Sequence, residues 1–271
     1  MARFKVTLEY AGGRYSGWQK QINARTVQGE LERVIAEAIG HDDFECQGAG
    51  RTDAGVHALM QVAHLEIALN MPLEKFRRQI NDELPADIHV LAIDKAAHRF
   101  HARHGAIRRS YLYQVSRRRS AFAKPFAWWV KEPLDIDRMT SAAARFAGMH
   151  DFRSFSDNDP DDKSTSVQVE RVTIAEADDL ILIRVVGSHF LWKMVRRMVG
   201  VLVEIGKGAL PVSAVDDFLE RSSGMPARLT APSAGLFLER VFYEGDEVEP
   251  PLRPAIPVRQ PRPPIVTSAG R

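Results

Sequence analysis

Hydrophobic and polar side chains along the first hundred residues follow an order that predicts six secondary-structure elements. Residues 3–10 alternate apolar and polar side chains, as a strand with one buried face does. A helical period begins after Thr26, a residue type that caps helices, and stops at Gly40. Strands flank residues 48–57, a second helix follows, and residues 88–93 form a further strand. The resulting order, β-α-β-β-α-β, is that of a ferredoxin-like unit.

The second half of the chain repeats this order. Its predicted elements are a strand at 111–115, a helix at 136–147, strands at 167–175 and 180–186, a helix at 190–205, a short helix at 212–219 and a strand at 236–243. The long helix carries apolar side chains on one side and Lys193, Arg196 and Arg197 on the other. We therefore expect an α+β fold in which two ferredoxin-like β-α-β-β-α-β halves share a mostly antiparallel central sheet, with the helices outside and a central cleft between the halves.

These patterns divide the chain into three parts. Residues 1–104 form the N-terminal half, residues 105–245 the C-terminal half, and residues 246–271 a tail. The tail holds seven prolines among Arg, Val and Ser residues, a composition that cannot build a core element. We expect this tail to be extended, disordered and dispensable for folding.

Charge is distributed unevenly, although the net charge of the 271 residues is only +2. No acidic residue lies between Asp94 and Glu132 or between Arg184 and Glu204, and both stretches contain several Lys and Arg residues. Local basic surfaces of this kind favour a polyphosphate partner. The chain begins directly with a strand pattern and has no apolar run of membrane-spanning length, so we expect a cytoplasmic protein.

Candidate chemistry is concentrated in residues 48–57, where three glycines, Arg51, Thr52 and Asp53 lie between two predicted strands. One interpretation is a hairpin turn with a surface ion pair, and the other is a catalytic carboxylate on a rigid loop. An earlier glycine-rich loop carries Trp18 and Gln19. An exposed tryptophan beside amide side chains would suit contacts with a flexible polar ligand.

Several classes of active site find no support in the sequence. The only cysteine, Cys46, lies in a strand pattern, so a disulfide within the chain and a Cys₂ metal site are excluded. The nine histidines are scattered and do not have the spacing of a metal hydrolase. Neither a Walker loop nor a G-x-G-x-x-G fingerprint that opens a helix is present. We therefore expect no metal ion and no cofactor.

The residues that remain match a known family. Residues 50–57, Gly-Arg-Thr-Asp-Ala-Gly-Val-His, resemble the signature around the catalytic aspartate of the tRNA pseudouridine synthase A family. Further segments resemble that family in the same order, at 15–19, 84–88, 100–103, 111–113, 151–155, 194–200, 230–232 and 235–236. The resemblance covers about residues 4–243. The chain departs from the family pattern at His104, Ser188 and Ser233, which bears on details of RNA contact.

The resemblance implies isomerisation of uridine to pseudouridine at positions 38–40, in the anticodon stem-loop of tRNA. In that reaction the N1–C1′ bond breaks and a C5–C1′ bond forms. Asp53 would act at the ribose, either as a nucleophile at C1′ or as a base at C2′, and the sequence leaves both open. Arg51 would help to hold the flipped state, Tyr111 would stack on the uracil and could assist proton removal from C5, and Arg196 would pair with Asp53 and keep it ionised.

The resemblance also implies that the central cleft binds tRNA and that a homodimer uses both subunits on one tRNA. The expected substrate contacts are Tyr111, Arg103, Arg108, Arg109, Trp18, Gln19 and Lys193. Two alternatives are a non-catalytic protein that binds structured RNA and a ferredoxin-like metabolic enzyme for a small anionic substrate. Salt-sensitive binding to tRNA would separate the RNA interpretations from the last one.

Overall fold

The computed structural model describes residues 1–157, 164–246 and 249–259. The elements of the first half are β1 (Ala2–Tyr10), η1 (a 3₁₀ turn, Gly12–Arg14), α1 (Val27–Ile39), β2 (Glu45–Gly48), β3 (His57–Ile67), α2 (Leu73–Glu83) and β4 (Ile88–Lys95). In space the strands follow the antiparallel order β4-β1-β3-β2. The caps of α1 are those predicted: the Thr26 hydroxyl accepts a hydrogen bond from the Gly29 amide, and Gly40 adopts a left-handed conformation.

The second half has the same order of elements with short additions. Its elements are β5 (Arg108–Ser116), β6 (Trp128–Trp129), α3 (Ile136–Ala143), η2 (Ala144–Phe146), β7 (Gly148–Asp151), η3 (Arg153–Phe155), β8 (Ser166–Ala177), β9 (Leu180–Gly187), α4 (Met194–Gly206), α5 (Ala214–Glu220), α6 (Met225–Arg228), η4 (Ser233–Gly235) and β10 (Leu236–Phe242). Its strand order, β10-β5-β9-β8, reproduces that of the first half. Helix α4 begins four residues later than predicted because Lys193 has a φ of +63°, which interrupts the helix.

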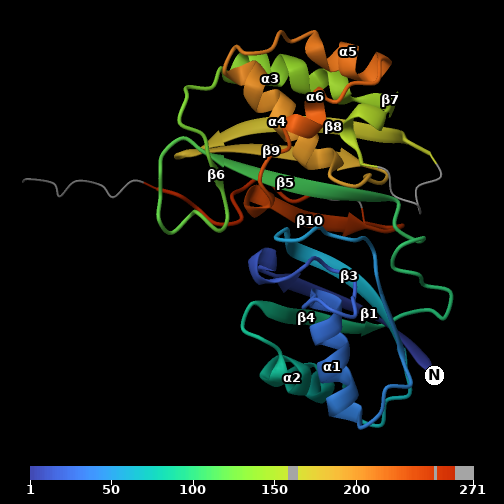
Figure 1. The fold of residues 1–271 in the computed structure, drawn as a ribbon. Helices are drawn as coiled ribbons and strands as arrows, with labels where there is room; N and C mark the ends of the chain where they lie inside the picture. Colours follow the sequence, from blue (N-terminus) through green and yellow to red (C-terminus); the bar gives the residue numbers. More distant parts are fainter. Residues whose placement is uncertain (158–163, 247–248, 260–271) are drawn as a thin grey trace, which may run out of the picture.

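The two halves join into one sheet through β3 and β10, which lie side by side in Figure 1. These strands pair in parallel, with Phe237 opposite His57 and Leu238 opposite Ala58. The only other parallel pair in the described residues is β5 with β6, so the sheet is mostly antiparallel. The α+β class and the paired ferredoxin-like halves predicted from the sequence are therefore confirmed.

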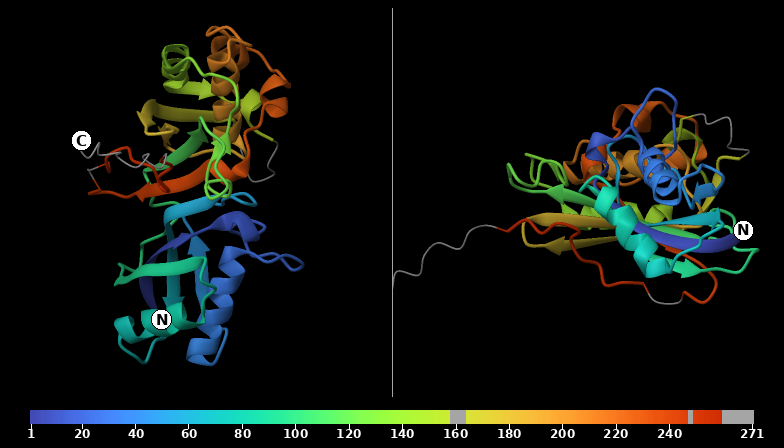
Figure 2. Two further views of the ribbon diagram at one scale, coloured as in Figure 1. Left: turned by 90° about the vertical axis from the view of Figure 1, so that its left-hand side faces the viewer. Right: turned by 90° about the horizontal axis from the view of Figure 1, so that it is seen from below.

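The helices cover one face of the sheet, as the view from below shows (Figure 2). Helix α4 is buried at eleven of its thirteen positions, and Arg196 and Glu204 are the exceptions. Arg197, predicted to lie on a polar side, is instead buried and pairs with Asp157. A buried guanidinium is stable here because a carboxylate neutralises it. Across the described ranges, no helix is both long and apolar enough to cross a membrane.

The segment after β10 contradicts the expectation of a disordered tail. Residues 249–259 cross the face of the sheet opposite the helices (Figure 2), where Val258 is buried in a cluster with Leu112 and Leu182. The buried Gln114 side chain accepts hydrogen bonds from the amides of Ala255 and Ile256, at 2.7 and 3.3 Å. A proline-rich segment cannot form a helix, but its free backbone amides can satisfy a buried side chain. Residues 247–248 and 260–271 lie outside the described residues.

Candidate active site at the junction of the two halves

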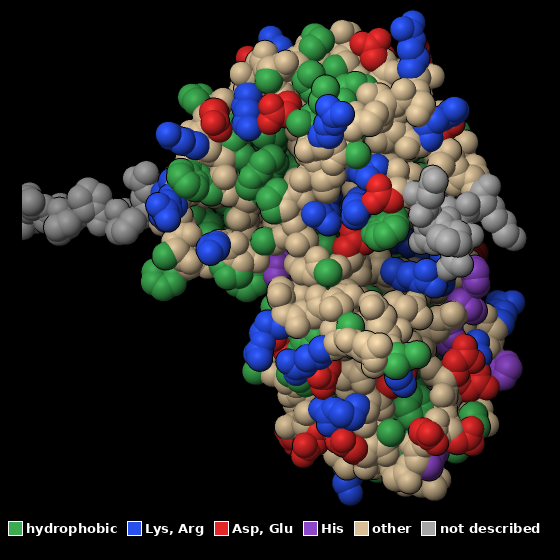
Figure 3. Space-filling model, viewed as in Figure 1, with side chains coloured by type: hydrophobic (Ala, Val, Ile, Leu, Met, Phe, Trp, Pro, Cys, Tyr) green, Lys and Arg blue, Asp and Glu red, His purple; other side chains and the backbone are tan. Residues whose placement is uncertain are grey.

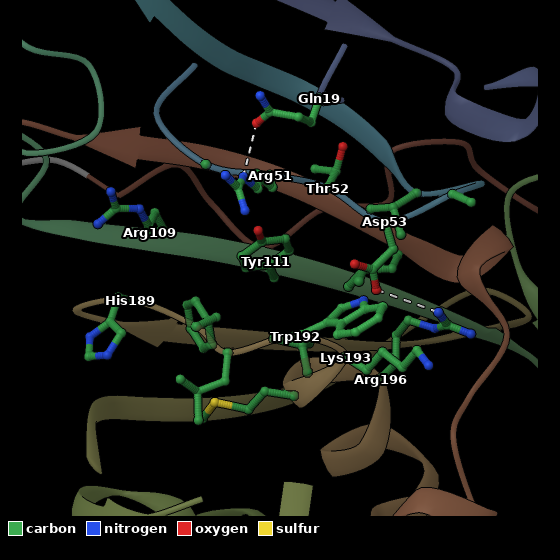
Figure 4. A pocket seen from close by; sticks show the side chains of 18 of the residues that line it. Gln19, Arg51, Thr52, Asp53, Arg109, Tyr111, His189, Trp192, Lys193 and Arg196 are labelled. Atoms are coloured by element: carbon green, nitrogen blue, oxygen red, sulfur yellow. Dashed lines mark hydrogen bonds and ion pairs between the residues drawn. The ribbon is translucent and has the colours of Figure 1, made fainter. Parts of the chain in front are cut away.

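A cavity of about 500 Å³ lies where the loop between β2 and β3 faces the turn between β9 and α4 (Figure 4). Both halves contribute to its wall, and Asp53 is the one carboxylate among the lining residues that the structure describes. The lining residues are Ser16, Gln19, Gln21, residues 49–54, Val56, Arg103, Arg109, Tyr111, residues 189–196 and Leu236. The space-filling view places several Lys and Arg side chains near the narrow junction between the halves (Figure 3). In the described part of the chain, no three His, Cys, Asp or Glu side chains gather as a metal ion would require.

The loop that follows β1 fixes the backbone of Asp53. The Trp18 amide donates a hydrogen bond to the carbonyl of Thr52 at 3.0 Å, and the Thr52 hydroxyl bonds to the Tyr10 hydroxyl at 2.8 Å. Gly17 has a φ of +91°, and a Cβ there would lie 2.5 Å from the Thr52 carbonyl oxygen. Only glycine allows the two loops to approach this closely. Asp53 therefore sits on a loop whose position is set by its neighbours.

Trp18 is part of this support and not a surface residue. Only 1% of it is exposed, and its ring lies 6.0 Å from that of Tyr10, centroid to centroid. The indole fills the space above Gly48, where a Cβ would lie 2.5 Å from Nε1. The expectation that an exposed Trp18 contacts the ligand is wrong, because the absent side chain at Gly48 leaves room to bury the ring.

Arg196, from the first turn of α4, faces Asp53 across the cavity (Figure 4). Its Nη1 lies 3.6 Å from Asp53 Oδ2, and its Nε donates to the Ala231 carbonyl at 2.7 Å. Burial raises the pKa of Asp53, while the charges of Arg196 and Lys193 act in the opposite direction. The predicted pair is present, but burial outweighs Arg196 in setting the pKa. A carboxylate with a raised pKa in a cavity is typical of functional sites.

Tyr111, from β5, lies at the floor of the cavity next to Asp53. Burial, followed by the nearby charge of Asp53, raises the pKa of Tyr111 to about 12. The hydroxyl is therefore protonated at neutral pH and can donate a hydrogen bond. Its ring meets Phe190 edge-on with centroids 5.1 Å apart, which fixes the ring plane. On the opposite wall, Arg51 Nε donates to the Gln19 side-chain oxygen at 2.9 Å (Figure 4).

The three arginines expected to contact phosphates have different surroundings. Arg103 is exposed and lines the cavity. Arg109 also lines it, but its guanidinium donates to the carbonyls of Ser188, Ala49 and Arg103 at 2.8 to 3.0 Å, so it ties the two halves together. Burial lowers the pKa of Arg109.

Arg108 does not line the cavity, contrary to expectation. It is one residue from Arg109 on β5, so the two side chains point to opposite faces of the sheet. There Arg108 lies 4.5 Å over the Phe242 ring and 3.3 Å from Glu170. The run of basic residues in the sequence did not reveal this alternation, because both faces of β5 carry an arginine.

Comparisons with known proteins identify the family of this chain. The family model described as tRNA pseudouridine synthase matches residues 7–104 and 142–244. The chain belongs to the tRNA pseudouridine synthase family. It is 41% identical to "tRNA pseudouridine synthase A" of Hyphomonas neptunium over 246 residues, which is 90% of this chain and 99% of that one. The proteins of the same name from Nitrobacter winogradskyi and Exiguobacterium sp. are 39% and 38% identical, over 97% and 90% of this chain and 100% and 99% of their own lengths.

Members of the tRNA pseudouridine synthase family are isomerases, so the expectation of an isomerase is confirmed at the level of the family. Eight of the ten predicted site residues line this one cavity, and the exceptions are Trp18 and Arg108. Trp192 also lines the cavity and was not predicted to do so from the sequence. The sequence held a signal for it, because Trp192 lies beside Lys193 in a basic stretch without acidic residues.

Proposed function

We propose that this synthase converts uridine to pseudouridine at positions 38–40 in the anticodon stem-loop of tRNA, with Asp53 as the catalytic carboxylate. One observation carries the proposal: Asp53 is the one carboxylate among the described residues that line the cavity, and it lies within ion-pair distance of Arg196. The family relationship supports the reaction type, and the resemblance of residues 50–57 to the family signature supports the choice of carboxylate.

The reaction is an isomerisation that consumes no other reactant. The N1–C1′ bond breaks and the C5–C1′ bond forms, while C5 loses a proton and N1 gains one. Asp53 would either attack C1′ or remove a proton from C2′. Burial destabilises its ionised form, which makes the carboxylate a stronger base and nucleophile and serves both routes. Arg196 would keep the carboxylate oriented toward the ribose.

The target uridine must leave its stack to reach Asp53. Tyr111 would then lie against the uracil, and its hydroxyl could donate a hydrogen bond. Because this hydroxyl keeps its proton at neutral pH, we assign Tyr111 a stacking role and not that of the base at C5. Arg51 and Gln19, joined by a hydrogen bond on the opposite wall, would fill the space that the base leaves. Arg103 and Lys193 would meet the phosphates beside it.

The test uses the purified protein and transcribed tRNAs with uridine at one of positions 38, 39 or 40. Mass spectrometry after carbodiimide treatment should find pseudouridine at these positions only. A matched transcript with cytidine at all three positions should remain unmodified. Pseudouridine elsewhere in the tRNA would reject the anticodon assignment, and binding without any pseudouridine would favour the non-catalytic alternative.

We also propose that the synthase acts as a homodimer in the cytoplasm, where tRNA is modified. The two basic stretches of the sequence are too extended for one small RNA loop, which supports a second subunit on the same tRNA. Light scattering at micromolar concentration should give twice the mass of the chain. A fully active monomer would contradict this part of the proposal.

A further inference from the structure

Trp192 is a large aromatic residue on the cavity wall for which the roles above give no use. It keeps 44% of its surface exposed, although an indole gains free energy from burial. Figure 4 shows its ring between Tyr111 and Arg196, on the wall opposite Gln19 and Arg51. Trp192 and Asp53 therefore line the same cavity, so a ligand bound at Asp53 can also contact the indole.

The turn that carries Trp192 is held in a conformation that its sequence disfavours. Lys193 has a φ of +63°, and only one other non-glycine residue in the described ranges has a positive φ. Such a conformation persists only where the surroundings impose it, and it is often found at functional sites. Asp157 imposes it here: its carboxylate accepts hydrogen bonds from Lys193 Nζ at 2.6 Å and from Arg197. The Asp157 amide donates to the Trp192 carbonyl at 3.3 Å, so the turn is fixed on both sides.

The cavity thus presents two aromatic side chains that differ in how far they are buried. Tyr111 is 9% exposed and held by Phe190, so it offers little more than one ring face. Trp192 is far more exposed. The Lys193 ammonium lies 4.8 Å from the centre of the indole, which leaves the remaining ring surface for a ligand. Two aromatic rings at different depths of the cavity are suited to stack on two successive bases of one RNA chain.

We propose that Trp192 is the stacking platform for a second nucleobase, the immediate neighbour of the target uridine, while Tyr111 takes the target itself. This inference rests on the proposed function and extends it to a two-nucleotide site. Stacking on an aromatic ring needs no particular hydrogen-bond pattern, so this subsite would accept any base. The fixed Lys193 turn keeps the indole in place before RNA arrives, which reduces the ordering cost of binding.

The test is a double-mutant cycle between the protein and the RNA. Stem-loops with an abasic nucleotide on the 5′ or the 3′ side of the target uridine are compared with the intact stem-loop by filter binding and by KM and kcat. With the parent enzyme, one of the two abasic positions should weaken binding about tenfold or more. Trp192→Ala should weaken binding of the intact RNA by a similar factor, and the abasic change should then cost nothing further. Trp192→Phe should restore most of the affinity.

Trp129 provides the matched control, because it is 42% exposed and lies outside the cavity lining. Trp129→Ala should bind the intact and abasic RNAs as the parent does. The proposal would be overturned if the losses from Trp192→Ala and from the abasic change were fully additive at both positions. It would also be overturned if Trp192→Ala bound the intact RNA as tightly as the parent does. A change of mass in light scattering without a loss of RNA affinity would instead assign Trp192 to a protein contact. Should Trp192→Ala not fold, the cycle is repeated with Trp192→Leu. If the parent binds RNA but forms no pseudouridine, the proposed function fails while the binding cycle still decides on Trp192.

Discussion

The two halves of the molecule have the same strand order but differ in the connections between their strands. In the first half, β2 and β3 are joined by residues 49–56, which carry Asp53. In the second half, the equivalent strands β8 and β9 are joined by a two-residue turn, Asp178 and Asp179. Both connections contain an aspartate, but only the longer one reaches the cavity. The shared scaffold sets where a connection lies, and its length decides whether it can carry chemistry.

The equivalent helices of the two halves also differ, and here the second half carries the specialised feature. Helix α2 of the first half buries only Phe76 and Ile80, whereas α4 of the second half is buried along almost its whole length. The turn before α4 lines the cavity, and no residue of α2 does so among those that the structure describes. Each half therefore contributes one specialised connection, and the cavity forms where the two meet.

The largest expected effect comes from replacing the aspartate in the longer connection, with the aspartate in the equivalent short turn as the control. Asp53→Asn should lower the rate of pseudouridine formation by at least about a thousandfold, because it removes the carboxylate needed by both proposed routes. Binding of tRNA should change little, since the charges that meet phosphate are untouched. Mass spectrometry of tRNA and filter binding measure the two quantities. Asp178→Asn, in the turn of the other half, should leave both unchanged, and activity of Asp53→Asn within tenfold of the parent would remove Asp53 from the mechanism.

The next effect tests whether the longer connection must be held rigidly. Gly17→Ala should disturb the Asp53 loop without touching its side chain, because a Cβ at Gly17 would lie 2.5 Å from the Thr52 carbonyl oxygen and φ is +91° there. We expect a rate loss of about a hundredfold, the scale that a shift of about 1 Å produces at a catalytic group. Single-turnover kinetics measure it. Gly13→Ala is the matched control, since a Cβ at Gly13 meets no atom within 4 Å; similar losses in both variants would refute the role of this contact.

The sequence predicted the fold well because periodicity and caps are local signals. The order of helices and strands along the chain, the Thr26 cap and the approximate extent of α4 could all be read from spacing. The loop that carries Asp53 was singled out because residues 50–57 form a continuous motif, and the catalytic role of Asp53 stays a prediction. Trp18 and Arg108 were misplaced for a different reason: whether a side chain faces a cavity or the core depends on partners far away in the sequence, here Gly48 and Phe242.

The tail was misjudged because composition describes what a segment can form alone and not what another part of the chain needs. Gln114 is fully buried in β5 and requires partners for its amide, which Ala255 and Ile256 supply. No periodicity in a proline-rich segment signals such contacts. The expectation that the tail is dispensable must therefore be revised.

Truncation is the test of that revision. A chain ending at Glu249 should be about 2 kcal/mol less stable, because it loses the burial of Val258 and the hydrogen bonds to Gln114, less the entropy regained by the freed segment. For a chain of this size, a loss of about 2 kcal/mol should lower the Tm by about 4–8 °C. A chain ending at Arg259 keeps these contacts and should melt with the parent. Equal Tm values for all three proteins would restore the view of a dispensable tail.

A smaller effect concerns the pH dependence of stability. Burial raises the pKa of Asp53, so the folded state binds this proton more tightly than the unfolded state, in which the pKa is near 3.8. The contribution of Asp53 to stability is therefore greatest below pH 4 and is lost as the pH rises through the raised pKa. Asn does not titrate, so the Tm of Asp53→Asn relative to the parent should increase from pH 4 to pH 7. Asp157, whose pKa its pairing with Lys193 lowers, should show the opposite trend when changed to Asn; parallel trends in the two variants would contradict the assigned shifts.

The smallest effect distinguishes a basic side chain at the cavity from one on the far face of the sheet. Arg103 is exposed on the cavity wall, whereas Arg108 lies on the far face beside Glu170. Each phosphate neutralised by a cation releases counterions, so Arg103→Ala should reduce the slope of log affinity against log salt by about one unit and weaken binding severalfold at low salt. Arg108→Ala removes the same charge from the protein and should leave the slope unchanged, which separates a direct contact from an effect of net charge. Filter binding at four or more salt concentrations measures both slopes. Equal losses would mean that the RNA also reaches the far face of the sheet, and an unchanged slope for Arg103→Ala would assign that residue a purely structural role.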